Sequence, residues 1–147
     1  MAGAYKGGRP TMGGRVHILE EHFHSAKLVY PTGAAGVTLT CGDAAAWTLG
    51  SFTEIVPANT IAKPFDIHFV EIEAVSTAAT YEVVLYAVET EIGRFRFTAA
   101  GTPNNIVFVP RPFQCGQQPK NTQIQAKIMS SSGNANTSTI SVEYHTY

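Results

Sequence analysis

Two neighbouring stretches, DIHFVEIEAV (66–75) and YEVVLYAVE (81–89), decide the fold class, because their apolar residues recur with a period of two. Alternation of this kind is typical of strands that bury one face, since successive side chains of a strand point to opposite sides. The first stretch places His68, Val70, Ile72 and Ala74 on one face, and the second places Tyr81, Val83, Leu85 and Ala87 together. Both stretches therefore predict half-buried antiparallel strands.

The same period extends outward from this pair. Longer alternating runs are IGRFRFT (92–98), TQIQAKIM (122–129) and TISVEYHTY (139–147), and shorter strand candidates are KLVY (27–30), VTLTC (37–41), WTL (47–49), FTEIV (52–56) and NIVFV (105–109). All eight prolines fall between or at the edges of these runs, where a missing N–H does not interrupt a ladder. No segment shows a helical stripe of ten or more residues. The pattern predicts an all-β, antiparallel two-sheet sandwich of the jelly-roll kind.

The phase of the alternation also predicts a core. The residues expected on inner faces are Phe95, Phe97, Ile124, Ile128, Val142 and Tyr144. On the opposite face of the 92–98 run, Arg94 and Arg96 are expected to pair with neighbouring acids across a hairpin.

Length and charge restrict the classes of protein. A chain of 147 residues fits one domain, and its 14% of charged residues is well below the usual value of about 25%. Low charge with 44% hydrophobic residues and a net charge of −1 is expected either of a surface covered by a partner or of a neutral monomer. No apolar run approaches the ~20 residues that span a bilayer, and the basic residues form no stripe, so neither a membrane nor a nucleic acid is an expected partner.

Residues 1–15, MAGAYKGGRPTMGGR, differ from the rest of the chain. They hold five glycines, one proline and three cations but no acid. Such a stretch buries too little apolar surface to fold alone. We expect residues 1–26 to be an extended arm with its linker and residues 27–147 to be the sandwich domain. The arm is either a disordered terminus or a segment that binds a neighbouring subunit or another protein through Tyr5, Lys6, Arg9 and Arg15.

The segment HILEEHFHS (17–25) concentrates three of the five histidines. It lacks the spacing of a zincin, which needs two histidines four apart with a glutamate after the first. His22 and His24 resemble the HxH pair of cupins, but no carboxylate follows before Glu54. We therefore expect no metal and no cofactor. Cys41 and Cys115 form no CxxC pair and are expected as two buried free thiols, with a single disulfide left open.

Motifs of covalent catalysis are also missing from the sequence. There is no GxSxG elbow and no GK[ST] phosphate loop, and no serine motif accompanies the spaced pair Asp66 and His68. Glu71 and Glu73 share a strand face and are interpreted as solvated residues. The expected protein is not an enzyme.

Several stretches of the sequence resemble a known family of proteins. The runs LVYPTGAAGVTLTCGDAAAWTLGSFTEIVPANTI, DIHFVEIEAV, YEVVLYAVETEIGRFRFT, NTQIQAKIMSSSG and VEYHTY are similar to small β-rich structural proteins of tailed bacteriophages. The resemblance covers roughly residues 28–147. It implies a jelly-roll-like virion protein that decorates or cements the capsid as a homotrimer bound to the major capsid protein. It also implies a place on the capsid surface after synthesis in the host cytoplasm.

An alternative within the same fold is a receptor- or carbohydrate-binding module of a phage tail or fibre. A sugar site usually combines exposed aromatic residues with carboxylates and amides. Trp47 and the pair Phe113 and Gln114 are the candidates, although Trp47 lies in AAAWTL and is expected in the core.

Overall fold

The computed structural model describes residues 26–100 and 109–147, and within them the chain forms nine strands and no helix. The strands are β1 (Leu28–Tyr30), β2 (Val37–Thr40), β3 (Thr53–Val56), β4 (Phe65–Val75), β5 (Ala79–Ala87), β6 (Thr90–Ala99), β7 (Val109–Pro112), β8 (Ile124–Ser130) and β9 (Thr137–Thr146). No helix in these ranges is long and apolar enough to cross a membrane.

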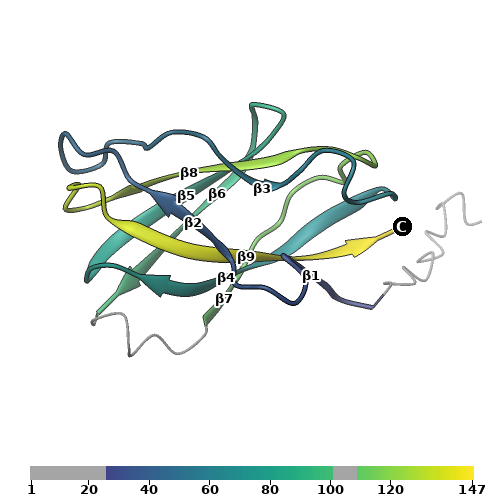
Figure 1. Ribbon diagram of the computed structural model, residues 1–147, viewed down its shortest axis with the longest axis horizontal. Helices are drawn as coiled ribbons and strands as arrows, with labels where there is room; N and C mark the ends of the chain where they lie inside the picture. Colours follow the sequence, from purple (N-terminus) through teal and green to yellow (C-terminus); the bar gives the residue numbers. More distant parts are fainter. Residues whose placement is uncertain (1–25, 101–108) are drawn as a thin grey trace, which may run out of the picture.

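The strands form two antiparallel sheets (Figure 1). Sheet A has the order β1-β9-β4-β7, with β2 also paired to β9, and sheet B has the order β3-β8-β5-β6. Strands β1 and β2 lie along the same edge of β9, because Leu28 is opposite Tyr144 whereas Val37 is opposite Ile140. Because β9 also pairs with β4 along its other edge, β9 is an interior strand of sheet A.

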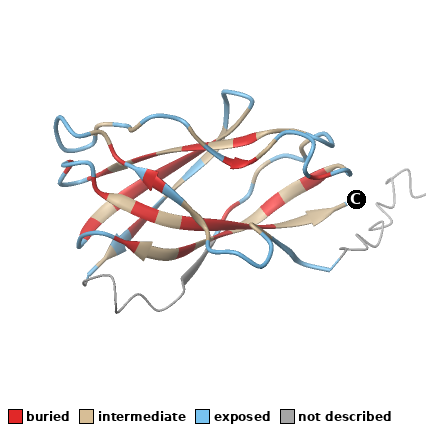
Figure 2. Ribbon diagram, viewed as in Figure 1, coloured by how far each residue is buried: buried red, intermediate tan, exposed pale blue. Residues whose placement is uncertain are grey.

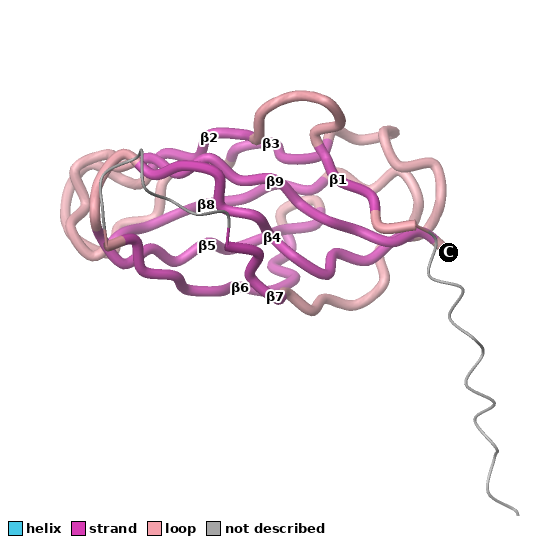
Figure 3. Tube along the Cα trace, turned by 90° about the horizontal axis from the view of Figure 1, so that it is seen from below, coloured by secondary structure: helices cyan, strands magenta, loops and turns pink. Residues whose placement is uncertain are grey.

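The pairings identify the winding of the chain. β2 pairs with β9, β3 with β8, β4 with β7 and β5 with β6, so the chain is one long hairpin of four strands out and four strands back. Successive pairs belong alternately to sheet A and sheet B. A hairpin wound in this way is a jelly roll. The prediction of an all-β, two-sheet sandwich is confirmed. The two sheets lie one above the other in Figure 1, and their strands overlie one another in the view from below in Figure 3.

The core lies between the two sheets, and buried positions alternate with partly buried ones along the strands (Figure 2). Among the residues predicted to be inside, Phe97, Ile124, Ile128 and Val142 are buried. Phe95 and Tyr144 are only partly buried, although both pack against the core cluster. The predicted phase of β6, β8 and β9 is therefore confirmed.

The predicted phase of β4 is wrong over part of its length. Ile67 is buried beside Phe65, whereas His68 and Ala74 are only partly buried. The register against β9 shifts between Ile67 and Phe69 and again between Ile72 and Ala74. Each shift is a β-bulge, which inserts one residue and exchanges the inner and outer faces beyond it. Simple alternation through 66–75 cannot reproduce two such exchanges.

Four further sequence predictions concern two short strand candidates, the N-terminal arm and the two cysteines. The run WTL (47–49) forms no strand and belongs to a long connection between β2 and β3. NIVFV (105–109) lies outside the described residues except for Val109, which begins β7. The proposed arm, apart from Ala26, also lies outside them. Both cysteines are free, and Cys41 is buried while Cys115 is only partly buried.

Candidate interaction surface

The connection between β2 and β3 follows the edge of sheet B and is held by backbone hydrogen bonds. Trp47 N donates to Ser130 O at 2.7 Å, and Gly50 N donates to Ile128 O at 2.9 Å. Inside the connection, Gly42 N donates to Thr48 O at 2.9 Å. Glycine is required at position 50, because a Cβ there would lie 1.8 Å from the carbonyl oxygen of Thr40. The connection is therefore fixed on β8 at two points.

Trp47 sits in this connection with an unusual backbone. Its φ is +61°, in the left-handed region, which costs roughly 1–2 kcal/mol for a residue with a Cβ. Its side chain is 41% exposed, and the guanidinium of Arg96 lies 4.9 Å from the ring centroid. The prediction that Trp47 belongs to the core is wrong. Backbone strain at an aromatic residue that stays 41% exposed is typical of a functional position.

Phe52 lies further along the same connection and makes a second aromatic contact. Its ring meets Tyr86 of β5 edge to face at 4.9 Å between centroids. The ammonium of Lys127, on β8, lies 3.9 Å from the Phe52 centroid. Phe52 is 39% exposed in spite of these contacts, as is Leu49 between the two aromatic residues. Three large apolar side chains of one connection are thus open to solvent.

Two arginines of β6 are held in place beside these residues. Arg94 Nη1 donates to Glu82 Oε1 at 2.9 Å, and Arg96 Nε donates to the other oxygen of the same carboxylate. Arg94 also donates to both oxygens of Glu91, at 2.7 and 2.8 Å, and these carboxylates raise its pKa. The Glu82 side chain is only 5% exposed. The predicted pairing of Arg94 and Arg96 with acids across a hairpin is confirmed.

These contacts cover the outer side of sheet B. Val84 faces away from the core cluster and is nevertheless 0% exposed. We call this surface the Trp47 face, and its residues are Trp47, Leu49, Phe52, Tyr86, Arg94, Arg96 and Lys127. Tryptophan, tyrosine and arginine are the side chains that dominate protein–protein contacts energetically. Chemically, the Trp47 face can bind a partner by stacking, apolar contact and charge-assisted hydrogen bonds.

A second group of polar side chains lies near the end of β9. His68 Nε2 is 2.9 Å from Asp66 Oδ1, and Tyr147 Oη donates to Asp66 Oδ2 at 2.5 Å. The rings of His68 and His145 are 4.4 Å apart. Burial raises the pKa of the nearby Cys115 thiol, which is opposite to the shift that activates a nucleophilic cysteine. Among the described residues, no group of three or more His, Cys, Asp and Glu side chains could hold a metal ion.

Only some of the site residues proposed from the sequence lie within the described part of the chain. Tyr5, Lys6, Arg9 and Arg15 lie outside the described residues, and so does the segment HILEEHFHS. Of the suggested sugar-binding residues, Phe113 is buried and Gln114 is exposed.

Sequence reasoning also missed members of the Trp47 face. The sequence places Leu49 and Phe52 in predicted strands and Lys127 only on the outer side of a strand. A usable signal was the spacing of Gly42 and Gly50 around the connection, which marks turns instead of a strand.

Comparisons with known proteins give structural neighbours only. No protein-family model and no curated protein matches the chain. Among solved structures, the chain is similar to the crystal structure of the infectious bursal disease virus VP2 subviral particle, with 16% identity and a TM-score of 0.40. It is also similar to the structure of the infectious bursal disease virus Gx strain, with 14% identity and a TM-score of 0.37. Each match covers 84% of this chain but only 34% and 33%, respectively, of the neighbour's chain.

Proposed function

We propose that the chain is a non-enzymatic structural protein of a phage virion, which decorates or cements the head by binding the major capsid protein. The observation that carries this proposal is the Trp47 face. It presents a strained, exposed tryptophan and two positioned arginines on a rigid jelly roll. These features suit a protein contact and require no chemistry.

The fold alone does not choose between functions, because jelly rolls serve as capsid proteins, lectins and cupins. The surface favours the first of these. Two of the three aromatic rings of the Trp47 face already carry a cation, Arg96 over Trp47 and Lys127 over Phe52, and their exposed parts remain open to contact with a partner. The resemblance of residues 28–147 to phage structural proteins supports the choice of a virion.

The finer parts of the proposal follow from the same resemblance. We propose that the protein lies on the capsid surface as a homotrimer. Tyr5, Lys6, Arg9 and Arg15 of the arm are proposed to add contacts to a neighbouring subunit. An arm gains affinity in this way because each contact is held at high effective concentration by the bound domain.

The proposal is tested by the attachment of variants to phage heads that lack the protein. Trp47→Ser removes the central aromatic residue of the Trp47 face and should weaken attachment by about 2 kcal/mol or more, roughly 30-fold. The measurement is the bound fraction in a pelleting assay over a range of protein concentrations.

The matched control is Val88→Ser, which removes another exposed apolar side chain near the opposite end of β8, where Val88 N donates to Gln123 O. It should attach as the unchanged protein does. Equal attachment of the Trp47 and Val88 variants would contradict the role of the Trp47 face. Failure of the unchanged protein to bind heads would remove the virion proposal itself.

A second candidate is binding of a glycan by a tail or fibre module, and the exposure of Trp47 is what favours it. A sugar ring could stack on the indole while the guanidinium of Arg96 offers a polar group beside it. A glycan array with the Trp47→Ser variant as control distinguishes the two candidates. Trp47-dependent binding to a defined glycan, without attachment to heads, would favour this candidate.

A further inference from the structure

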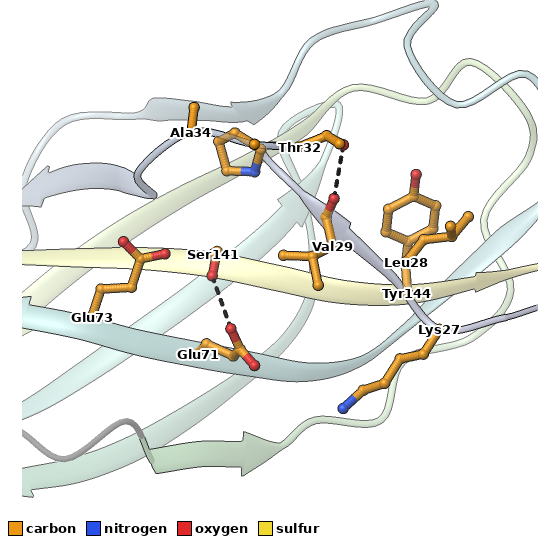
Figure 4. A pocket seen from close by; sticks show the side chains of 11 residues that line it. Lys27, Leu28, Val29, Thr32, Ala34, Glu71, Glu73, Ser141 and Tyr144 are labelled. Atoms are coloured by element: carbon orange, nitrogen blue, oxygen red, sulfur yellow. Dashed lines mark hydrogen bonds between the residues drawn. The ribbon is translucent and has the colours of Figure 1, made fainter.

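The outer side of sheet A carries a groove of about 380 Å³, separate from the Trp47 face. Its walls come from β1 and the turn after it, and its floor comes from β4 and β9 (Figure 4). Val29 is 39% exposed at this groove, whereas Leu28 and its cross-strand partner Tyr144 line it from the strand edge, with their side chains turned away from Glu71 (Figure 4). The groove thus offers apolar contact to a ligand lying along β1.

Two carboxylates of β4 complete the floor. Glu71 Oε2 accepts a long hydrogen bond from Ser141 Oγ at 3.4 Å, and Glu73 Oε2 accepts from Gly36 N at 2.8 Å. The cation of the lining, Lys27, forms an ion pair with Glu143 instead. Within the residues that the structure describes, neither Glu71 nor Glu73 forms a salt bridge. A ligand with positive charges would therefore complement the groove.

We propose that this groove binds residues 1–15 of a second copy of the chain. That stretch contains three cations, Lys6, Arg9 and Arg15, and no acid. Its five glycines allow the backbone to approach a surface closely, and Tyr5 can add to the apolar contact with Val29. Charge and apolar character therefore match between the groove and this segment.

The direction of the chain favours a second copy over the same copy. Leu28 is opposite Tyr144, so the chain enters β1 from the side of the C-terminus. Glu71 is opposite Ser141, which lies in the other direction along β9. The segment before β1 would have to reverse fully to reach the carboxylates of its own groove.

Length allows the segment to reach a neighbour. Arg9 precedes Lys27 by 18 positions, and a chain of that length spans up to about 60 Å when extended. A domain of this size has a radius of gyration of about 14 Å. Each copy would give one arm and receive one, and such head-to-tail contacts close into a ring when the rotation allows it. This inference holds whether or not the oligomer binds a phage head.

The first experiment measures self-association by sedimentation of the full chain. The groove variant Glu71→Lys with Glu73→Lys, and separately a deletion of residues 2–15, should each weaken self-association at least about tenfold. The effect of the groove variant should shrink at high salt, since exposed charges are screened. The control carries the same change of charge elsewhere, Glu54→Lys with Glu89→Lys, two exposed residues outside the groove. It should associate as the unchanged protein does.

A milder pair, Glu71→Gln with Glu73→Gln, keeps the shape of the groove if the lysine variant does not fold, and it should show a smaller loss in the same direction. The second experiment mixes the deletion variant, which has an intact groove, with the groove variant, which has an intact arm. The mixture should form a complex that neither variant forms alone.

Three results would overturn the inference. The unchanged chain could stay monomeric, the groove variants could associate normally, or the mixture could fail to form a complex. The last result, together with loss of association in both single variants, would place the arm in the groove of its own copy.

Discussion

At the scale of single residues, Ile128 and Trp47 show what an apolar letter in a sequence can predict. Ile128 alternates with polar neighbours in β8 and is 0% exposed, as predicted. The apolar neighbours of Trp47 predict that it lies in the core, but its side chain is 41% exposed in the connection between β2 and β3. Hydrophobic character indicates burial only when the phase of a regular strand supports it. No such phase exists between Cys41 and Phe52.

The phenol of Tyr147 should titrate late. Its hydrogen bond to Asp66 raises the pKa of Tyr147 to about 12, above the value of about 10 expected in an unfolded chain. The contribution of this bond to folding is therefore complete below about pH 10 and is lost as the pH rises through about 12.

The phenolate absorbance of the unchanged protein and of Tyr147→Phe can be measured as the pH is raised. The difference between the two curves should show the titration of Tyr147. In an Asp66→Asn background the midpoint should fall toward 10, because the carboxylate that stabilises the neutral phenol is gone. A midpoint already near 10 in the unchanged protein would show that the hydrogen bond does not persist in solution.

At the scale of elements, the sequence predicts strands well and their irregularities poorly. Alternation located all the longer strands, because each buries one face along most of its length. The bulges of β4 were not visible, because a bulge leaves the composition unchanged and is fixed by pairing with β9. The hairpin of β5 and β6 is easier, since the sequence predicts that Arg94 and Arg96 pair with neighbouring acids across a hairpin, and the structure places Glu82 opposite Arg96.

The first bulge of β4 makes a prediction about adjacent residues. Ile67→Ala should lower the free energy of unfolding by about 2–5 kcal/mol, because Ile67 is 1% exposed between the sheets. His68→Ala should cost much less, because His68 is the inserted residue and is only partly buried. Denaturant unfolding of both variants is the measurement. The opposite ranking would mean that β4 alternates without a bulge.

At the scale of the whole molecule, the order of strands could not be predicted from the sequence. Each pairing of the jelly roll except β5 with β6 joins segments far apart in the chain, such as Val37 with Ile140. The alternation of apolar residues within one strand does not identify the distant strand with which it pairs. The Trp47 face was missed for the same reason, since it combines one connection with side chains of β5, β6 and β8. Only folding brings these parts together.

The two ends of the chain should differ sharply in what they contribute to stability. Deleting residues 2–26 removes no residue of a described strand. At a protein concentration where the full chain is monomeric, it should shift the melting temperature by less than about 2 °C, as expected when under about half a kcal/mol is lost. Deleting residues 138–147 removes most of β9, which pairs with β1, β2 and β4 and buries Ile140 and Val142. That variant should show no cooperative transition.

A shorter deletion, of residues 145–147, supplies the control for the C-terminal end. It removes the bond from Tyr147 to Asp66 but keeps Ile140 and Val142, so it should melt cooperatively at a lower temperature. Loss of the cooperative transition on deleting residues 2–26 would show that the arm is part of the core and that the boundary after residue 26 is wrong. A cooperative transition without residues 138–147 would instead contradict the central position of β9, on which the winding of the whole jelly roll depends.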